Sequence, residues 1–127
     1  MILPNLKQDM MIKIKRVYEP PNRNDGVRIL VDRLWPRGIS KKDAKISIWP
    51  KDMAPSHELR KWFSHDEKKF NKFRIKYFME LDDKKDKIKE ILSQLPGKIT
   101  LVYAAKDPRI NHAVCLKEYL SKSFLKR

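Results

Sequence analysis

The sequence predicts an α/β protein with a small, mostly parallel sheet of about three to four strands, flanked by helices in one compact domain. Two short segments, 27–31 and 99–103, are apolar and rich in β-branched residues, as strands buried on both faces are. Residues 39–98, which separate their ends, leave ample length for the right-handed crossover that joins parallel strands. The 127 residues suffice for one hydrophobic core and are too few for two.

Composition excludes several classes of protein. The 41% apolar and 36% charged fractions are typical of a folded globular chain. No window is apolar enough to cross a membrane, and the first residues lack a secretory layout, so we expect a cytoplasmic protein. The single Cys115 excludes an internal disulfide. The net charge of +14 is spread along the chain, and such a field attracts polyanions.

The sequence of residues 1–31 predicts an extension, an edge strand and a central strand. Residues 1–10 are expected to form a flexible extension, unless translation begins at Met11, and residues 11–127 to form the domain. Residues 12–18 alternate apolar and basic side chains, as a strand near a sheet edge does. The loop 19–26 is too short for a helical crossover, which favours an antiparallel pair with 27–31. We expect 27–31 at the centre of the sheet.

The remaining elements are mostly helices. Ser40 is expected to cap a short turn over 41–44, and Ser56 a second helix. Ile46, Ile48 and Trp49 suggest a short extended segment between them. Ser64 and Glu67 have the spacing of a capping box that opens a longer helix. That helix carries one apolar stripe, which consists of Phe70, Phe73, Tyr77, Phe78 and Leu81.

After a charged break, the chain returns to helix, strand and helix. The spacing of Ile88, Ile91, Leu92 and Leu95 predicts a helix that ends at Pro96-Gly97. The strand 99–103 follows. A last helix from about Ile110 is expected to pack Ala113, Leu116 and Leu120 inward, with Cys115 also in the core.

Polar residues gather where the two buried strands end. Because ligands of α/β sheets bind at the carboxyl ends of parallel strands, we expect these residues to form one site. An amino end of a helix beside Arg37 and Lys106 would suit a phosphate or carboxylate. The candidates for ligand binding are Arg33, Trp35, Arg37, Lys106, Asp107 and Asn111, and those for general acid or base chemistry are His112 and Asp32.

Structural roles compete with these. Asp32 and Arg33 could form a salt bridge that fixes the bend, Trp35 could be a core or lid aromatic, and His112 could cap the last helix.

No metal and no cofactor is expected. Three scattered histidines make a zinc site unfavourable, and three glycines exclude a glycine-rich phosphate loop or dinucleotide fingerprint.

Four motifs together resemble a known family, the YeaO-like branch of the domain of unknown function 488 family. They are LVDRLWPRG at 30–38, APS and LRKWF within 54–63, HD with spaced aromatics and EL at 65–81, and LVYAAKDPRINHA at 101–113. The resemblance runs from about Met11 to Leu120 and implies a compact α/β domain. It implies no activity, since none is assigned to the family.

A sister branch of that family carries cysteines at two positions of the expected site. At these positions this chain has Tyr103 and Asn111; it retains the following His112, and Ala113 replaces an arginine. The resemblance therefore implies that thiol chemistry is absent here. The sister branch also has a helix between its first two strands, which implies a parallel pair and argues against the antiparallel expectation.

Two functions follow from these observations. The first is binding of a phosphorylated or otherwise anionic, nucleotide-like ligand at the strand ends, with hydrolase or transferase chemistry as an enzymatic version. The alternative is a non-catalytic basic module that binds nucleic acid or another partner through its distributed charge. The sequence does not indicate the ligand or the oligomeric state.

Overall fold

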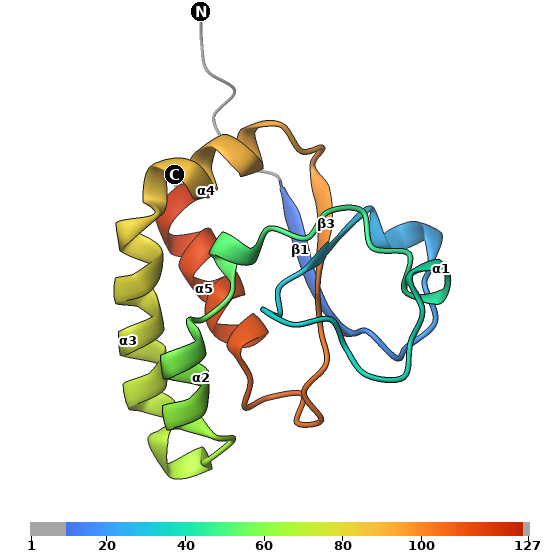
Figure 1. The fold of residues 1–127 in the computed structure, drawn as a ribbon. Coiled ribbons are helices and arrows are strands. Elements are labelled where there is room, and N and C mark those ends of the chain that lie inside the picture. The colour runs from blue at the N-terminus through green and yellow to red at the C-terminus, as the bar shows by residue number, and fades with distance from the viewer. Residues whose placement is uncertain (1–9, 126–127) are drawn as a thin grey trace, which may run out of the picture.

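A computed structural model describes residues 10–125 and shows a three-stranded parallel sheet with helices (Figure 1). The strands are β1 (Met11–Arg16), β2 (Val27–Leu30) and β3 (Lys98–Tyr103), in the order β1-β3-β2. The expectation that 27–31 is the central strand is wrong, because β3 occupies that position. Both segments are equally apolar, and Ile29 and Leu101 are both fully buried, so hydrophobicity does not distinguish the centre from the edge.

The expected antiparallel pairing of the first two strands is also wrong. β1 and β2 both run parallel to β3, with Ile14 and Ile29 each in register with Leu101. They share a direction, as the resemblance implied, but they are not neighbours. The short connection between them spans the sheet, with β3 inserted later. Gly26 lies so close to β3 that an added Cβ would come within 2.2 Å of the Lys98 carbonyl oxygen, so only glycine fits there.

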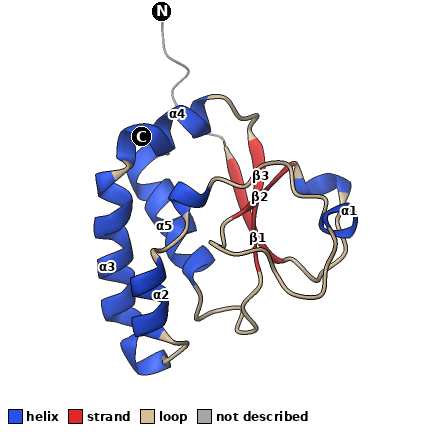
Figure 2. Ribbon diagram, viewed as in Figure 1, coloured by secondary structure: helices blue, strands red, loops and turns tan. Residues whose placement is uncertain are grey.

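Of the five α-helices found among residues 10–125, four lie on one face of the sheet, and Figure 2 shows this arrangement. These are α2 (His57–Phe63), α3 (Phe70–Asp83), α4 (Lys85–Ser93) and α5 (His112–Phe124). The short α1 (Lys41–Ala44) lies on the other face with the loops around it. The expected caps are confirmed: the hydroxyls of Ser40 and Ser56 accept hydrogen bonds from the Asp43 and Leu59 amides at 3.0 and 3.1 Å.

Two expected helix starts are corrected. Ser64 does not open a helix; it ends α2 with a φ of 44°, and Asp66 instead caps a 3-10 turn over Glu67–Lys69 before α3 begins. Left-handed backbone at Ser64 reverses the chain, which removes its side chain from a capping position. The last helix begins at His112, two residues after the expected start at about Ile110, because the side chain of Asn111 accepts from the Val114 amide at 3.0 Å and caps it.

The main core fills the space between the sheet and the four helices. Side chains of β1, β2 and β3 that point to this face meet the apolar stripe of α3 and the inner face of α5. The inward positions expected for α5 are buried, and Cys115 is buried with them. The largest fully buried side chains are Tyr77, Phe73, Ile29, Leu30, Met53, Leu81, Ile88, Leu92, Ile99, Leu101, Leu116 and Leu120.

The opposite face of the sheet buries charge. Asp25 is fully buried and its carboxylate contacts Arg28 Nη1 at 2.6 Å and Lys15 Nζ at 3.2 Å. Arg28 also donates to the Ala44 carbonyl oxygen, at 3.0 Å from Nε and 2.8 Å from Nη2. The hydroxyl of Thr100, in the central strand, donates to the Asp25 carbonyl oxygen at 2.7 Å. This ionic cluster joins the loop after β1, the sheet and α1.

Met10, which the sequence assigns to an extension, packs into the core with 7% of its surface exposed. The rest of that expected extension, residues 1–9, lies outside the described residues, as do residues 126–127. Among residues 10–125, no helix has both the length and the apolar character that crossing a membrane requires.

Candidate functional site

The carboxyl ends of β2 and β3 meet at one edge of the sheet, and Asp32 joins them. One carboxylate oxygen of Asp32, Oδ2, accepts a hydrogen bond from the Ala104 amide at 3.1 Å. The other, Oδ1, lies 2.6 Å from Nε2 of His112, the first residue of α5. A single side chain thus connects the end of β2 to the end of β3 and to the start of α5. The convergence expected of Asp32 and His112 is present in the structure.

The second ring nitrogen of His112 remains available. An ionised carboxylate only accepts hydrogen bonds, so Nε2 donates to Asp32 and leaves Nδ1 as the other nitrogen. No buried side-chain nitrogen or oxygen among residues 10–125 lacks a partner, and no hydrogen bond to Nδ1 is found there, so Nδ1 reaches solvent. An imidazole oriented by a carboxylate in this way can accept or donate a proton at its free nitrogen.

Tyr103 and Asn111 lie beside His112. The ring of Tyr103 packs edge-on against the imidazole, with centroids 6.4 Å apart. Burial raises the pKa of the Tyr103 hydroxyl, which also hydrogen bonds to the Asn111 side chain. Asn111 is nearly fully buried and donates from Nδ2 to the Asp107 carbonyl oxygen at 2.8 Å. Tyr103 therefore stays protonated, and Asn111 holds the loop and caps α5.

Indole N–H groups fix the loop that follows β2. Trp49 donates to the Asp32 carbonyl oxygen at 2.7 Å, and Trp35 donates to the Ile39 carbonyl oxygen at 2.8 Å. The two rings pack edge to face with centroids 5.6 Å apart. The half-buried Trp35 thus packs against Trp49 and has the structural role of an aromatic residue in the loop. Arg33 donates from Nε to the Pro55 carbonyl oxygen at 3.1 Å, and no ion pair joins it to Asp32 in the described part of the chain.

Arg37 and Lys106 are exposed, and neither forms an ion pair with a residue in the range 10–125. A chain of contacts links them. The Tyr18 hydroxyl donates to the Arg37 carbonyl oxygen at 2.6 Å, and the Arg16 guanidinium lies 4.9 Å from the centre of the Tyr18 ring. Arg16 in turn donates from Nε to the Ala105 carbonyl oxygen at 2.8 Å, next to Lys106.

Arg16 is a site residue that sequence reasoning missed. It also donates from Nη2 to the Ala104 carbonyl oxygen at 3.1 Å, so it brings the end of β1 to the loop that carries the predicted residues. The available signal was weak: Arg16 is one of several cations within the expected strand 12–18, and only the structure shows that it is the last residue of β1.

Asp107 shapes the loop before α5. Its Oδ1 accepts hydrogen bonds from the Arg109 and Ile110 amides at 2.8 and 3.0 Å. These backbone hydrogen bonds lower the pKa of the Asp107 carboxyl. The carboxylate is therefore engaged by its own turn.

Two further features concern the acidic, histidine and cysteine side chains of the described residues. Among residues 10–125, no group of three or more His, Cys, Asp and Glu side chains has the arrangement of a metal site. Burial raises the pKa of the Cys115 thiol to about 12, which keeps it protonated and unreactive at neutral pH.

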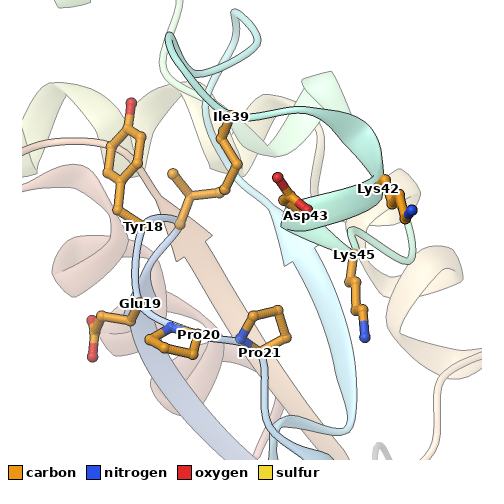
Figure 3. Close-up of a pocket in the computed structure, with 9 residues that line it drawn as sticks. Tyr18, Glu19, Pro20, Pro21, Ile39, Lys42, Asp43 and Lys45 are labelled. Carbon is orange, nitrogen blue, oxygen red and sulfur yellow. The ribbon is translucent and has the colours of Figure 1, made fainter.

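A pocket of about 470 Å³ opens near this site, between the segment after β1 and helix α1 (Figure 3). Sequence reasoning missed it, because Pro20-Pro21 indicates only a loop. The available signal was that the apolar residues Val17 and Tyr18 come directly before this loop. The lining residues are Val17, Tyr18, Glu19, Pro20, Pro21, Ile39, Lys42, Asp43 and Lys45.

Comparisons with known proteins place the chain in a family. The chain is 43% identical over 114 residues to the uncharacterized protein YeaO of Escherichia coli, which covers 87% of this chain and 97% of YeaO. It is 39% identical over 116 residues to the uncharacterized proteins Rv3073c of Mycobacterium tuberculosis and Mb3100c of Mycobacterium bovis, with 90% of this chain and 97% of each relative covered.

A search of solved structures found no significant match. Residues 11–127 match a family model described as the inactive DUF488-N3 subclade. Together with the likeness to YeaO, this match shows that the chain belongs to the DUF488 family, in its YeaO-like branch.

Proposed function

We propose that this protein binds a phosphorylated or other anionic ligand at the carboxyl ends of its parallel strands, without chemical turnover. One observation carries the proposal: Asp32, His112 and the exposed cations Arg37 and Lys106 lie on segments that contact one another at that edge. In parallel sheets this edge is where ligands bind. The two cations would supply charge-assisted donors to an anion.

The loops that carry these groups are held in place before any ligand arrives. Indole and phenol donors fix the loop from Asp32 to Ile39, and the Arg16 guanidinium fixes the loop after β3. A preorganised site loses less conformational entropy when it binds. Arg37 and Lys106 have no acidic partner within residues 10–125 and so are free to contact an anion.

Binding without turnover is favoured over the enzymatic version for two reasons. The family model that matches this chain is described as inactive. In addition, a buried, protonated phenol at Tyr103 and a carboxamide at Asn111 stand beside His112, and neither is an activated nucleophile. Asp32 and His112 would then orient and bind the ligand.

The proposal is tested by calorimetry with inorganic phosphate, pyrophosphate and AMP. We expect the double variant R37A/K106A to bind these probes at least about ten-fold more weakly, because each lost charge-assisted hydrogen bond contributes about 1.5–3 kcal/mol. The matched control is K85A/K89A on α4, which removes the same charge at the opposite end of the molecule in Figure 1. It should bind the probes as the native protein does.

The same experiment distinguishes the alternative of a basic nucleic-acid-binding module. That alternative predicts similar losses in both double variants when a single-stranded RNA oligonucleotide is the probe, with a steep dependence on salt. Failure of all three small anions to bind the native protein at millimolar concentration would reject the proposal. Turnover of a phosphate ester that is lost in His112→Ala would replace it by the enzymatic version.

A further inference from the structure

We propose that the pocket between residues 17–21 and helix α1 binds a flat heteroaromatic ring that bears N–H donors, as a nucleobase does. The pocket measures about 470 Å³, within the range of about 300–1,000 Å³ that is typical of small-ligand sites. It is lined by none of the residues predicted for the strand-end site. The inference therefore does not rest on the anion-binding function proposed above.

The walls of the pocket suit a flat apolar ring. Val17 is among the lining residues and is 1% exposed, and Ile39 packs in the same small hydrophobic cluster. In Figure 3 Pro20 and Pro21 face Ile39 across the opening. Proline side chains are rigid and have little rotamer entropy to lose when a ring packs on them.

Tyr18 forms the aromatic wall and is held in place from two sides. Its hydroxyl donates to the Arg37 carbonyl oxygen at 2.6 Å, and the Arg16 guanidinium packs on its ring. The side chain is nevertheless 42% exposed, so ring surface is available for stacking. Stacking of a base on an aromatic side chain contributes substantially to binding and tolerates any base.

Asp43 gives the pocket its chemical preference. Its amide donates to Ser40, but its carboxylate makes no hydrogen bond or ion pair with any residue in the described range. Figure 3 shows this carboxylate extending toward Ile39, whereas Lys42 extends away from the space beside Tyr18. The other acid of the lining, Glu19, is engaged by the Arg16 amide at 2.8 Å. A free carboxylate beside an apolar wall selects a ring with N–H donors.

The test uses neutral nucleosides, which carry no phosphate and so do not depend on the strand-end cations. We expect adenosine and cytidine at millimolar concentration to shift the amide NMR signals of Val17, Tyr18 and Ile39. Purine riboside, which lacks the exocyclic amino group, should bind more weakly than adenosine. The replacement Asp43→Asn, which keeps the shape, should weaken adenosine binding by about ten-fold.

Glu90→Gln is the matched control, since it removes one exposed acid from α4 and should leave adenosine binding unchanged. A second pair of variants distinguishes the contribution of the Tyr18 ring from that of its hydroxyl. Tyr18→Phe should retain most of the affinity for adenosine, and Tyr18→Ala should lose it. Adenosine shifts that persist in Asp43→Asn and Tyr18→Ala would overturn the proposal, as would the absence of amide shifts at 17–19 with every nucleoside. A proline-rich peptide that displaces adenosine from the same signals with higher affinity would identify the pocket as a peptide site and also overturn it.

Each proposal fails separately. Phosphate binding without nucleoside binding would support anion binding at the strand ends and reject the proposed nucleobase pocket between residues 17–21 and α1. Nucleoside binding without phosphate binding would do the reverse.

Discussion

The two faces of the sheet are stabilised by different interactions. The face toward α2, α3, α4 and α5 is apolar, and its core is continuous from the sheet to the helices. The face toward α1 has only a small apolar cluster around Val17, Ala44 and Val102, next to the buried ions at Asp25. Neighbouring residues of β2 serve the two faces in turn, Arg28 on one and Ile29 on the other. Close packing of apolar side chains therefore holds the helices against the sheet, whereas ion pairs and hydrogen bonds hold the loops on the other face.

The largest effect is expected for the loop face. Asp25→Asn leaves Arg28 and Lys15 without their shared anion, and breaking a buried ion pair in this way costs about 3–5 kcal/mol. Urea unfolding followed by circular dichroism measures the loss. A change below about 1 kcal/mol would mean that solvent reaches this cluster and that the two faces are less different than described.

A slightly smaller effect is expected on the helical face. Leu116→Ala removes a fully buried side chain of α5 and should lower the free energy of unfolding by about 3 kcal/mol. Met79→Ala on α3 is the control, because that side chain is 64% exposed and its loss should change stability little. Equal losses at both positions would show that residue 79 is buried in solution, for example by a second molecule.

Acid should weaken an ion pair that joins two helices. The hydrogen bond from Arg74 lowers the pKa of Glu118 to about 2, well below its value in the unfolded chain. A carboxyl whose folded pKa is depressed contributes stability above the unfolded pKa and loses it as the pH falls toward the folded pKa. The free energy of unfolding of the native protein should therefore fall between about pH 4.5 and 2. In Glu118→Gln this fall should be smaller by about 1 kcal/mol over the same range. An unchanged slope in the variant would contradict the assignment.

Asp25 should contribute to the same acid loss from the other face. Burial alone would raise the pKa of its carboxyl, but the Asn22 amide and the cations Lys15 and Arg28 lower it overall. Its contribution is likewise present above the unfolded pKa and lost below it.

The smallest expected effect is the dependence of the two ion pairs on salt concentration, which should differ between the two faces of the sheet. The Glu118 side chain is 31% exposed and that of Asp25 is fully buried. Raising the salt concentration to about 1 M shortens the Debye length to about 3 Å and screens exposed pairs more than buried ones. We expect the destabilisation by Glu118→Gln to shrink at high salt while that of Asp25→Asn stays the same, as measured by paired urea titrations.

Much of the fold follows from the sequence because local patterns determine it. The apolar segments 27–31 and 99–103 become buried strands, and the hydroxyls of Ser40 and Ser56 cap their helices. Strand order does not follow in this way. Two equally apolar strands can exchange the centre and the edge of a sheet without any change in composition, and a short loop can span a third strand as well as close a hairpin.

The candidate site could be predicted in part. The strand-end rule brings together Asp32 and His112 from positions 80 residues apart. It does not reveal which polar atoms the protein itself engages, such as the Asp107 carboxylate with its two amides. Arg16 was not predicted because its role depends on which strand lies beside β3. The pocket was not predicted because Pro20-Pro21 indicates the backbone conformation of the loop but not which side chains pack against it.

The central position of β3 has a consequence for how the chain is made. Both strand pairs need residues 98–103, which are the last of the three described strands to leave the ribosome. Until then β1 and β2 have no partner strand in the described sheet, and each pairing must close a loop of about 70 residues or more. Sheet formation in this protein therefore waits for residues 98–103, and in a nascent chain that stops before residue 98 the only backbone partner of β2 among the described residues is the segment around Ile48.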